Sequence, residues 1–266
     1  MVGTIATMES VAITLFPFLL VIVVICFSFC DANSNVLCIE SERNALLKFK
    51  NDLVDPSNRL ASWVEGGDCC KWLGVVCHNS TGHINQLHLA APLSKTGYFA
   101  TNADWEAYNN SKRSKLRGRI NPSLLELKHL SSLDLSNNNF SSIQIPKFFG
   151  LLESLTYLNL SRARFQGAIP YNLGNLSKLQ YLDLRGNDLK SKSLQWVSGL
   201  SSLQYLDLSS ADLYKANDWV QVALKLPSLL ELHLTDCGLE DDPSSISVNS
   251  SKSLLVLDLS WNSLSS

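Results

Sequence analysis

The phrase "LSKLQYLDLRGNDL", residues 176–189, returns as "LSSLQYLDLSSADL" at residues 200–213, an offset of 24 residues. Most of the aligned positions are identical. A unit this short is too small to bury a hydrophobic core alone, so its copies must stack on one another. The repeat therefore predicts a fold made of short units stacked along one axis.

The repeat runs through most of the chain as the pattern L-x-x-L-x-L-x-x-N-x-L. Its copies begin at Ile84, Leu130, Leu155, Leu179, Leu203, Leu229 and Leu254. The last six starts are 24–26 residues apart, which is the period of leucine-rich repeats. The first two are 46 residues apart, so an insertion is expected near 94–115. We assign residues 84–266 to these seven units.

Alternation of leucine with other residues inside each unit predicts a short strand with the leucines facing inward. The chain then turns, crosses the opposite side and returns one strand spacing further along. We therefore expect an α/β repeat protein, a right-handed leucine-rich-repeat solenoid with one curved parallel sheet. The sheet forms the concave face because the layer of returning segments is wider.

The ninth position of the pattern normally holds asparagine, whose amide can donate to and accept from the backbone of the turn. Its occupants here are Asn138, Ala163, Asn187, Ala211, Cys237 and Asn262. We expect the two alanines to interrupt this ladder, so that a backbone group or water must substitute. Cys237 is expected to be a buried free thiol.

Four cysteines, Cys38, Cys69, Cys70 and Cys77, form an even group ahead of the repeats. Such a group in a secreted chain indicates disulfides. A zinc site is the alternative, but adjacent Cys69 and Cys70 do not give the spaced pairs of such sites. His83, His88 and His233 are expected on the surface rather than as metal ligands, and no metal or cofactor is expected.

Residues 11–29 form an unbroken apolar run, which fits either a cleaved signal peptide at 1–32 or an uncleaved membrane anchor. Both interpretations place the remainder in the secretory pathway, at the cell surface or in the apoplast. Six N-x-S/T sequons support secretion: Asn79, Asn109, Asn139, Asn159, Asn175 and Asn249. The net charge is −2 and no long basic run occurs, which argues against nucleic acid as a partner.

Two repeat units, "LRGRINPSLLELKHL" from Leu116 and "FQGAIPYNLGNLSKL" from Phe165, approximate an L-x-G-x-I-P pattern. They follow "CIESERNALLKFKNDLVDPSNRLASWVEGGDCCKWLGVVC", residues 38–77. Together these segments resemble the plant-specific leucine-rich-repeat class with its N-terminal cap, particularly receptor-like proteins of the ethylene-inducing-xylanase receptor group. The resemblance implies a cap at 33–83, the disulfides Cys38–Cys69 and Cys70–Cys77, and a co-receptor kinase as a partner.

The expected cap covers the exposed end of the solenoid core. Spacing of three and four residues predicts a helix at 40–53 with Leu46, Phe49 and Leu53 on one face. Trp63 and Trp72 should add apolar area. The units from Leu179 and Leu203 lack the G-x-I-P element, so their convex sides should be irregular.

No C-terminal cap follows the unit that begins at Leu254. Members of the resembled family continue with further units, a membrane helix and a short tail, so this chain looks like part of a longer product. Membrane attachment is then expected only through a C-terminal helix beyond residue 266 or through the N-terminal apolar segment.

No catalytic motif occurs in the sequence, so an enzyme is not expected. The candidate site is the concave face, where tyrosines recur in register, although stacked tyrosines could equally serve sheet packing. The candidate binding residues are Tyr157, Tyr181, Asp183, Arg185, Tyr205, Asp207, Glu231 and His233.

The expected function is therefore recognition without catalysis, in a cell-surface immune or developmental receptor-like protein. Its concave face would bind a protein, peptide or glycan ligand, or a co-receptor. The alternative is a secreted inhibitor of microbial wall-degrading enzymes, similar to polygalacturonase inhibitors.

Overall fold

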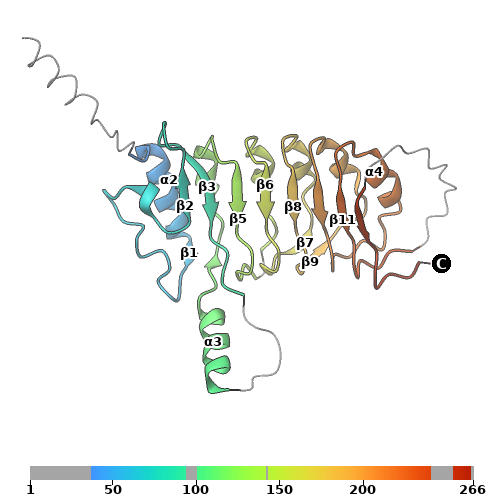
Figure 1. Cartoon of the computed structure of the whole chain (residues 1–266), viewed down its shortest axis with the longest axis horizontal. Coiled ribbons are helices and arrows are strands. Elements are labelled where there is room, and N and C mark those ends of the chain that lie inside the picture. The colour runs from blue at the N-terminus through green and yellow to red at the C-terminus, as the bar shows by residue number, and fades with distance from the viewer. Residues whose placement is uncertain (1–36, 94–100, 142, 241–253, 265–266) are drawn as a thin grey trace, which may run out of the picture. The chain divides into compact units, whose positions relative to one another are not determined.

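The computed structural model describes residues 37–93, 101–141, 143–240 and 254–264 (Figure 1). The expected signal segment at 1–32 and the sequon at Asn249 lie outside these ranges. Within them, no helix combines the length and apolar character that a membrane crossing requires.

One sheet of eight strands runs along the described part of the chain (Figure 1). In spatial order its strands are β2 (Val75–Cys77), β3 (Ile84–His88), β5 (Ser132–Asp134), β6 (Tyr157–Asn159), β8 (Tyr181–Asp183), β10 (Tyr205–Asp207), β11 (Glu231–His233) and β12 (Val256–Asp258). Only the β2–β3 pair is antiparallel. Every other pair is parallel, which confirms the predicted leucine-rich-repeat solenoid.

The leucines of the repeat form the core of the solenoid. The middle residues of successive strands, such as Leu158, Leu182 and Leu206, pair in register and are almost fully buried. Burying a leucine side chain contributes ~1.5–3 kcal/mol, and each unit repeats this contribution against its neighbours. The stack therefore fixes the register of the outward residues too.

Alanine interrupts the asparagine ladder as expected, and at Ala163 a backbone group substitutes: Phe140 N donates to Ala163 O at 2.8 Å. The asparagine of the next unit compensates further, because each asparagine serves two units. Asn187 Nδ2 donates to Leu184 O in its own unit at 2.7 Å and to Leu160 O in the preceding unit at 2.9 Å. Its Oδ1 accepts from the backbone N–H groups of Ala163 and Phe165 at 3.1 and 3.0 Å. The asparagine therefore completes the unit that carries Ala163.

Cys237 performs part of the same role for the second alanine unit. Its Sγ donates to Leu208 O, in the unit that carries Ala211, at 3.3 Å. The thiol is buried and free, as predicted, and burial raises its pKa to about 12. Asn262 in the next unit donates to Leu234 O at 2.7 Å, so the ladder continues past the cysteine.

The returning segments on the convex side are mostly short 3-10 helices: η2 (Pro122–Glu126), η3 (Lys147–Leu151), η4 (Tyr171–Asn175) and η5 (Gln195–Gly199). Beside them, β7 (Gln166–Ala168) and β9 (Asp188–Lys190) form a second, two-stranded parallel sheet. The unit from Leu203 departs from this pattern and returns through an α-helix, α4 (Trp219–Lys225).

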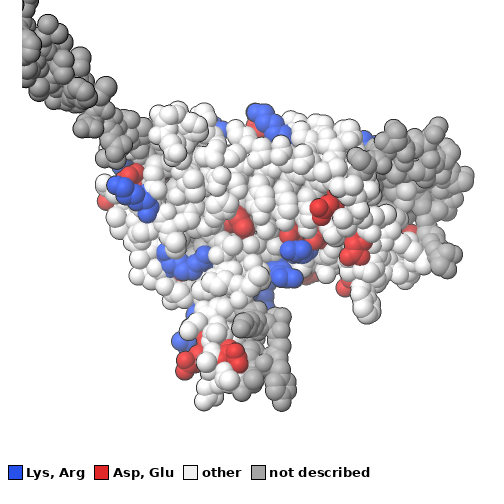
Figure 2. Space-filling view, in the orientation of Figure 1, with Lys and Arg blue, Asp and Glu red and all other residues white. Residues whose placement is uncertain are grey.

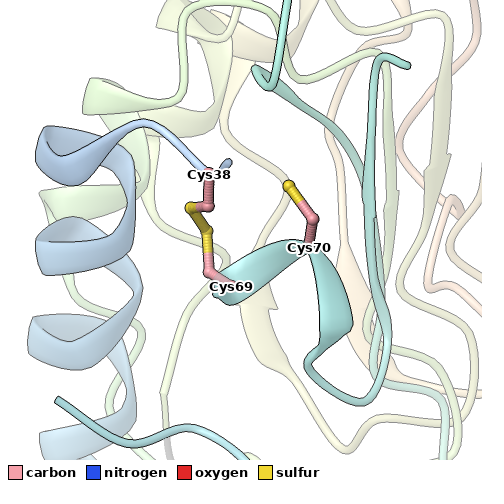
Figure 3. A group of neighbouring side chains, drawn as sticks. All are labelled: Cys38, Cys69 and Cys70. Atoms are coloured by element: carbon pink, nitrogen blue, oxygen red, sulfur yellow. A yellow bond between two sulfur atoms is a disulfide. The ribbon is translucent and has the colours of Figure 1, made fainter. Parts of the chain in front are cut away.

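The N-terminal cap is held by two disulfides, Cys38–Cys69 and Cys70–Cys77, as predicted. Cys69 and Cys70 lie on η1 (Cys69–Lys71), and Figure 3 shows the Cys70 side chain beside the Cys38–Cys69 disulfide. Three of the four sulfurs lie within 4.8 Å of one another. Because all four are used in disulfides, this cluster offers no thiolate ligand to zinc.

The cap helix α2 (Glu40–Asn51) buries Leu46 and Phe49, but it ends before Leu53. Leu53 instead belongs to β1 (Leu53–Val54), which pairs antiparallel with β4 (Arg117–Gly118). This pairing connects the cap to the repeat segment that follows the insertion, a contact distant in sequence that helical periodicity could not reveal. The insertion contains helix α3 (Asn102–Arg113), seen projecting from the repeats in Figure 1.

Polar groups from the repeats complete the cap. Glu42, almost fully buried on α2, accepts from Ile84 N at 2.7 Å and contacts His83 Nδ1 at 2.9 Å. Arg59 donates to Ala90 O and Ser114 O at 2.7 and 2.9 Å, and burial lowers its pKa. His83 is therefore a structural partner of the cap rather than a free surface histidine.

Candidate functional site

Three tyrosines form a continuous stack on the outward face of the sheet. Tyr157 and Tyr181 have ring centroids 4.5 Å apart, with 11° between the ring planes. The next pair, Tyr181 and Tyr205, lies 4.3 Å apart at 8°. The rings stack because β6, β8 and β10 pair with these residues directly opposite one another.

One end of the stack meets the histidine and glutamate of β11. The His233 ring lies 5.3 Å from the Tyr205 ring, tilted by 40°. His233 Nε2 is 3.5 Å from a carboxylate oxygen of Glu231, which occupies the next position of the tyrosine column. The face therefore changes from aromatic to polar toward the C-terminal units.

Arg185 lies between two buried carboxylates next to the tyrosines. Its Nη1 donates to Asp207 Oδ2 at 3.2 Å, and its Nε lies 3.4 Å from Asp183 Oδ2. The Asp183 side chain is fully buried, whereas 40% of the Arg185 side chain is exposed. The guanidinium is thus positioned by the protein and still presents a donor-rich edge to solvent.

The aspartates also support the turn that follows each strand. Asp183 Oδ1 accepts from Arg185 N at 3.0 Å, and Asp207 Oδ1 accepts from Ser209 N at 2.9 Å. Both aspartates therefore support the turn that follows their own strand. The second carboxylate oxygen of each aspartate remains for Arg185.

Burial dominates the electrostatics of this cluster. It raises the pKa of Asp183 to about 6, against the opposing effect of the Arg185 backbone N–H and guanidinium. It also raises the pKa of Tyr205 to about 12, with the Asp207 carboxylate adding to the effect. The tyrosines are therefore neutral at physiological pH and act as apolar surfaces with hydroxyl edges.

The Asn159 sequon lies at the N-terminal end of the stack. Asn159 Nδ2 donates to the Tyr157 hydroxyl at 3.3 Å, and its Oδ1 accepts from the Ser161 N–H at 3.0 Å. A glycan on Asn159 would cover this end. The accessible part of the candidate site is then the surface around Tyr181, Arg185 and Tyr205.

Asp183, Arg185 and Asp207 lie on a face of the molecule that otherwise carries few charged side chains. Figure 2 shows mostly uncharged surface along the sheet, with acidic and basic side chains close together toward the lower edge of the middle strands. Together the tyrosine stack and Arg185 offer apolar area beside a fixed cation. This combination suits a protein or peptide contact, in which aromatic and arginine side chains commonly dominate the binding energy.

All eight candidate residues come from neighbouring strands β6, β8, β10 and β11 or from the residues just after them. Sequence reasoning missed two features, the burial of Asp183 and the bridging of both aspartates by Arg185. The available signal was the arginine itself, because the equivalent positions of the other units from Leu130 onward hold serine or threonine.

Comparisons with known families match the repeats and the cap separately. The leucine rich repeat N-terminal domain family matches residues 39–78. Leucine rich repeat families match residues 128–189, 153–213 and 225–242.

Two tomato (Solanum lycopersicum) relatives match nearly the whole chain. Receptor-like protein EIX1 is 41% identical over 90% of this chain, and Receptor-like protein EIX2 is 46% identical over 87%. The chain spans 23% and 22% of their respective lengths.

Among solved structures, the ectodomain of the Arabidopsis receptor kinase HAESA, in complex with an IDA peptide hormone ligand, superposes with a TM-score of 0.66. It is 25% identical, over 84% of this chain and 33% of that one. That structure supplies an example of this architecture with a bound peptide.

Proposed function

Because this chain belongs to the leucine-rich-repeat family and matches the N-terminal part of plant receptor-like proteins, we propose that it is a ligand-recognition segment of a cell-surface receptor-like protein. It acts by binding and catalyses no reaction. Its ligand is a protein or peptide, and a co-receptor kinase carries the signal onward. The proposal extends to an extracellular location, reached through the secretory pathway.

The observation that carries this proposal is the tyrosine stack with Arg185 beside it. Leucines would maintain the solenoid without any outward aromatic residue, so the stack is not required by the core. Three half-buried rings present a rigid apolar strip whose side chains have little conformational freedom left to lose on binding. Arg185, already oriented by two carboxylates, adds a directed charge at the middle of the strip.

The test compares tyrosines on and off this face. The probe is a purified ethylene-inducing xylanase, the protein ligand suggested by the resemblance to that receptor group, and the readout is surface plasmon resonance with the secreted full chain immobilised. We expect Tyr181→Ala and Tyr205→Ala each to weaken binding by about 2 kcal/mol, or roughly thirtyfold.

Tyr171→Ala is the matched control, because Tyr171 lies on η4 and its side chain is 71% exposed. It should bind like the wild type, and circular dichroism should show all variants folded. Equal affinity of wild type and the Tyr181/Tyr205 double variant would contradict the proposal that this face recognises the ligand.

A further inference from the structure

A pocket of about 400 Å³ lies away from the tyrosine stack, beside the two-stranded sheet of β7 and β9. Its lining comes from three successive units: Ala168, Ile169, Lys190, Ser191, Lys192, Asp212, Tyr214 and Lys215. It forms where two units lack the G-x-I-P element. There, the apolar segment Ala168-Ile169-Pro170 is replaced in the next two units by Lys190-Ser191-Lys192 and by Tyr214-Lys215.

The pocket lining carries a net positive charge, and its lysines have no acidic partners among the described residues. Three lysines face one aspartate, and within the described part of the chain none of the three ammonium groups forms an ion pair. One carboxylate oxygen of Asp212 already has a partner, because Oδ1 accepts from Tyr214 N at 3.3 Å. An anionic ligand would therefore find several unpaired cations at the pocket and little opposing charge.

The backbone at the pocket has few hydrogen bonds to offer a peptide. Lys190 pairs with Ala168 on one side and Asp212 on the other. Lys190 O accepts from Ile169 N at 3.0 Å, and Ser191 N donates to Asp212 O at 3.0 Å. An extended peptide that binds by adding a strand needs an open sheet edge, and these groups are already paired.

The remaining features favour a sugar with carboxylates. Tyr214 is 56% exposed, so its ring provides a flat surface on which the C–H face of a sugar ring can pack. Lysine ammonium groups are point charges on flexible stems, which suits carboxylates that recur along a chain better than one rigid bidentate site. The pocket volume is within the range of small-ligand sites.

We infer that this lysine pocket binds an acidic oligosaccharide, whose carboxylates contact Lys190, Lys192 and Lys215 while one sugar ring packs on Tyr214. The site is independent of the tyrosine stack. A receptor segment with this second site would contact a uronate-containing polysaccharide and a protein ligand through different faces.

The experiment measures binding of three probes to the folded full chain by isothermal titration calorimetry. The probes are a linear oligouronate, its fully methyl-esterified form, and a polyglutamate peptide of similar charge. We expect the oligouronate alone to bind, with an affinity that falls as salt is raised. The triple variant Lys190→Gln/Lys192→Gln/Lys215→Gln should bind about tenfold to hundredfold more weakly.

A second triple variant, Lys128→Gln/Lys147→Gln/Lys178→Gln, removes the same charge from exposed lysines outside the pocket and should keep wild-type affinity. Tyr214→Ala should weaken binding, whereas Tyr214→Phe should retain it. Thermal melting of each variant reports folding. Equal loss in both triple variants, or polyglutamate binding as tightly as oligouronate, would overturn the assignment.

Discussion

Asn187 shows how one side chain can stabilise two repeat units. Its amide makes hydrogen bonds with Leu160 O and Leu184 O and with the N–H groups of Ala163 and Phe165. All four partners are buried backbone groups, and the side chain is only 7% exposed. Removing the amide would leave them without these bonds where water has little access.

Asn187→Ala should therefore lower the free energy of unfolding by at least about 3 kcal/mol, since each buried polar group left unpaired costs ~1–3 kcal/mol. Urea denaturation followed by circular dichroism would measure this. Asn175→Ala, at an exposed position on η4, is the control and should change stability by less than about 0.5 kcal/mol. A similar effect of the two substitutions would argue against the shared ladder.

The raised pKa of Asp183 makes the free energy of unfolding depend on pH. Its pKa in the folded chain is raised to about 6, whereas an unfolded aspartate titrates near 3.9. Between these values the folded state holds more protons than the unfolded state, so this group's contribution falls as pH rises. Below the unfolded pKa the contribution is fully present, and above pH 6 it is lost.

Asp183→Asn removes this titration while an amide oxygen remains to accept from Arg185 N. Relative to the variant, the wild type should gain about 2 kcal/mol in stability as pH falls from 7 to 4. Melting temperatures of both proteins across this range give the difference. A constant difference between the two would show that Asp183 does not titrate as described.

Among the elements, the convex 3-10 helices pack closely enough to need glycine. Gly150 on η3, Gly174 on η4 and Gly199 on η5 each face a carbonyl oxygen, and an added Cβ would lie 2.1–2.3 Å from it. The oxygens belong to Asn172, Trp196 and Gly174 respectively. Any larger residue must push two stacked units apart.

Gly150→Ala should consequently destabilise the chain by about 1–3 kcal/mol, the usual effect of overpacking, despite the better helix propensity of alanine. Lys147→Ala on the same helix η3 is the matched control, because Lys147 is exposed. Thermal unfolding of the two variants distinguishes them. An unchanged melting temperature for Gly150→Ala would mean that the units slide apart without penalty.

The elements also show what the sequence could reveal. Strand positions and the tyrosine register followed from the leucine period, because inward and outward positions alternate locally. The α-helix α4, the β1–β4 pairing and the lysine pocket did not follow. Each depends on contacts between units or across the insertion, which no local period records.

In the molecule as a whole, the N-terminal cap contains two disulfides that close loops of different length. Cys38–Cys69 spans 31 residues and Cys70–Cys77 spans 7. In the chain-entropy description, a longer closed loop restricts the unfolded chain more. The first disulfide also joins the start of α2 to η1, across the width of the cap.

Replacing Cys38 and Cys69 by serine should therefore destabilise the chain more than replacing Cys70 and Cys77, by about 1 kcal/mol. Removal of either pair should cost ~2–5 kcal/mol. Denaturant unfolding of both double variants beside the wild type tests the order. The reverse order would indicate that native contacts, rather than loop closure, set the contribution of each bridge.

Because each asparagine bonds to two units, the order of asparagine and alanine units determines which unit can be deleted without losing these hydrogen bonds. Excision of the unit that carries Ala163 would leave Asn138 and Asn187 as neighbours, each with carbonyl partners within reach. Excision of the unit that carries Asn187 would instead bring two alanine units together, with no amide between them. Recombination within this array should therefore tolerate deletion of an alanine unit better than deletion of an asparagine unit, even though both kinds of unit carry the same leucine pattern.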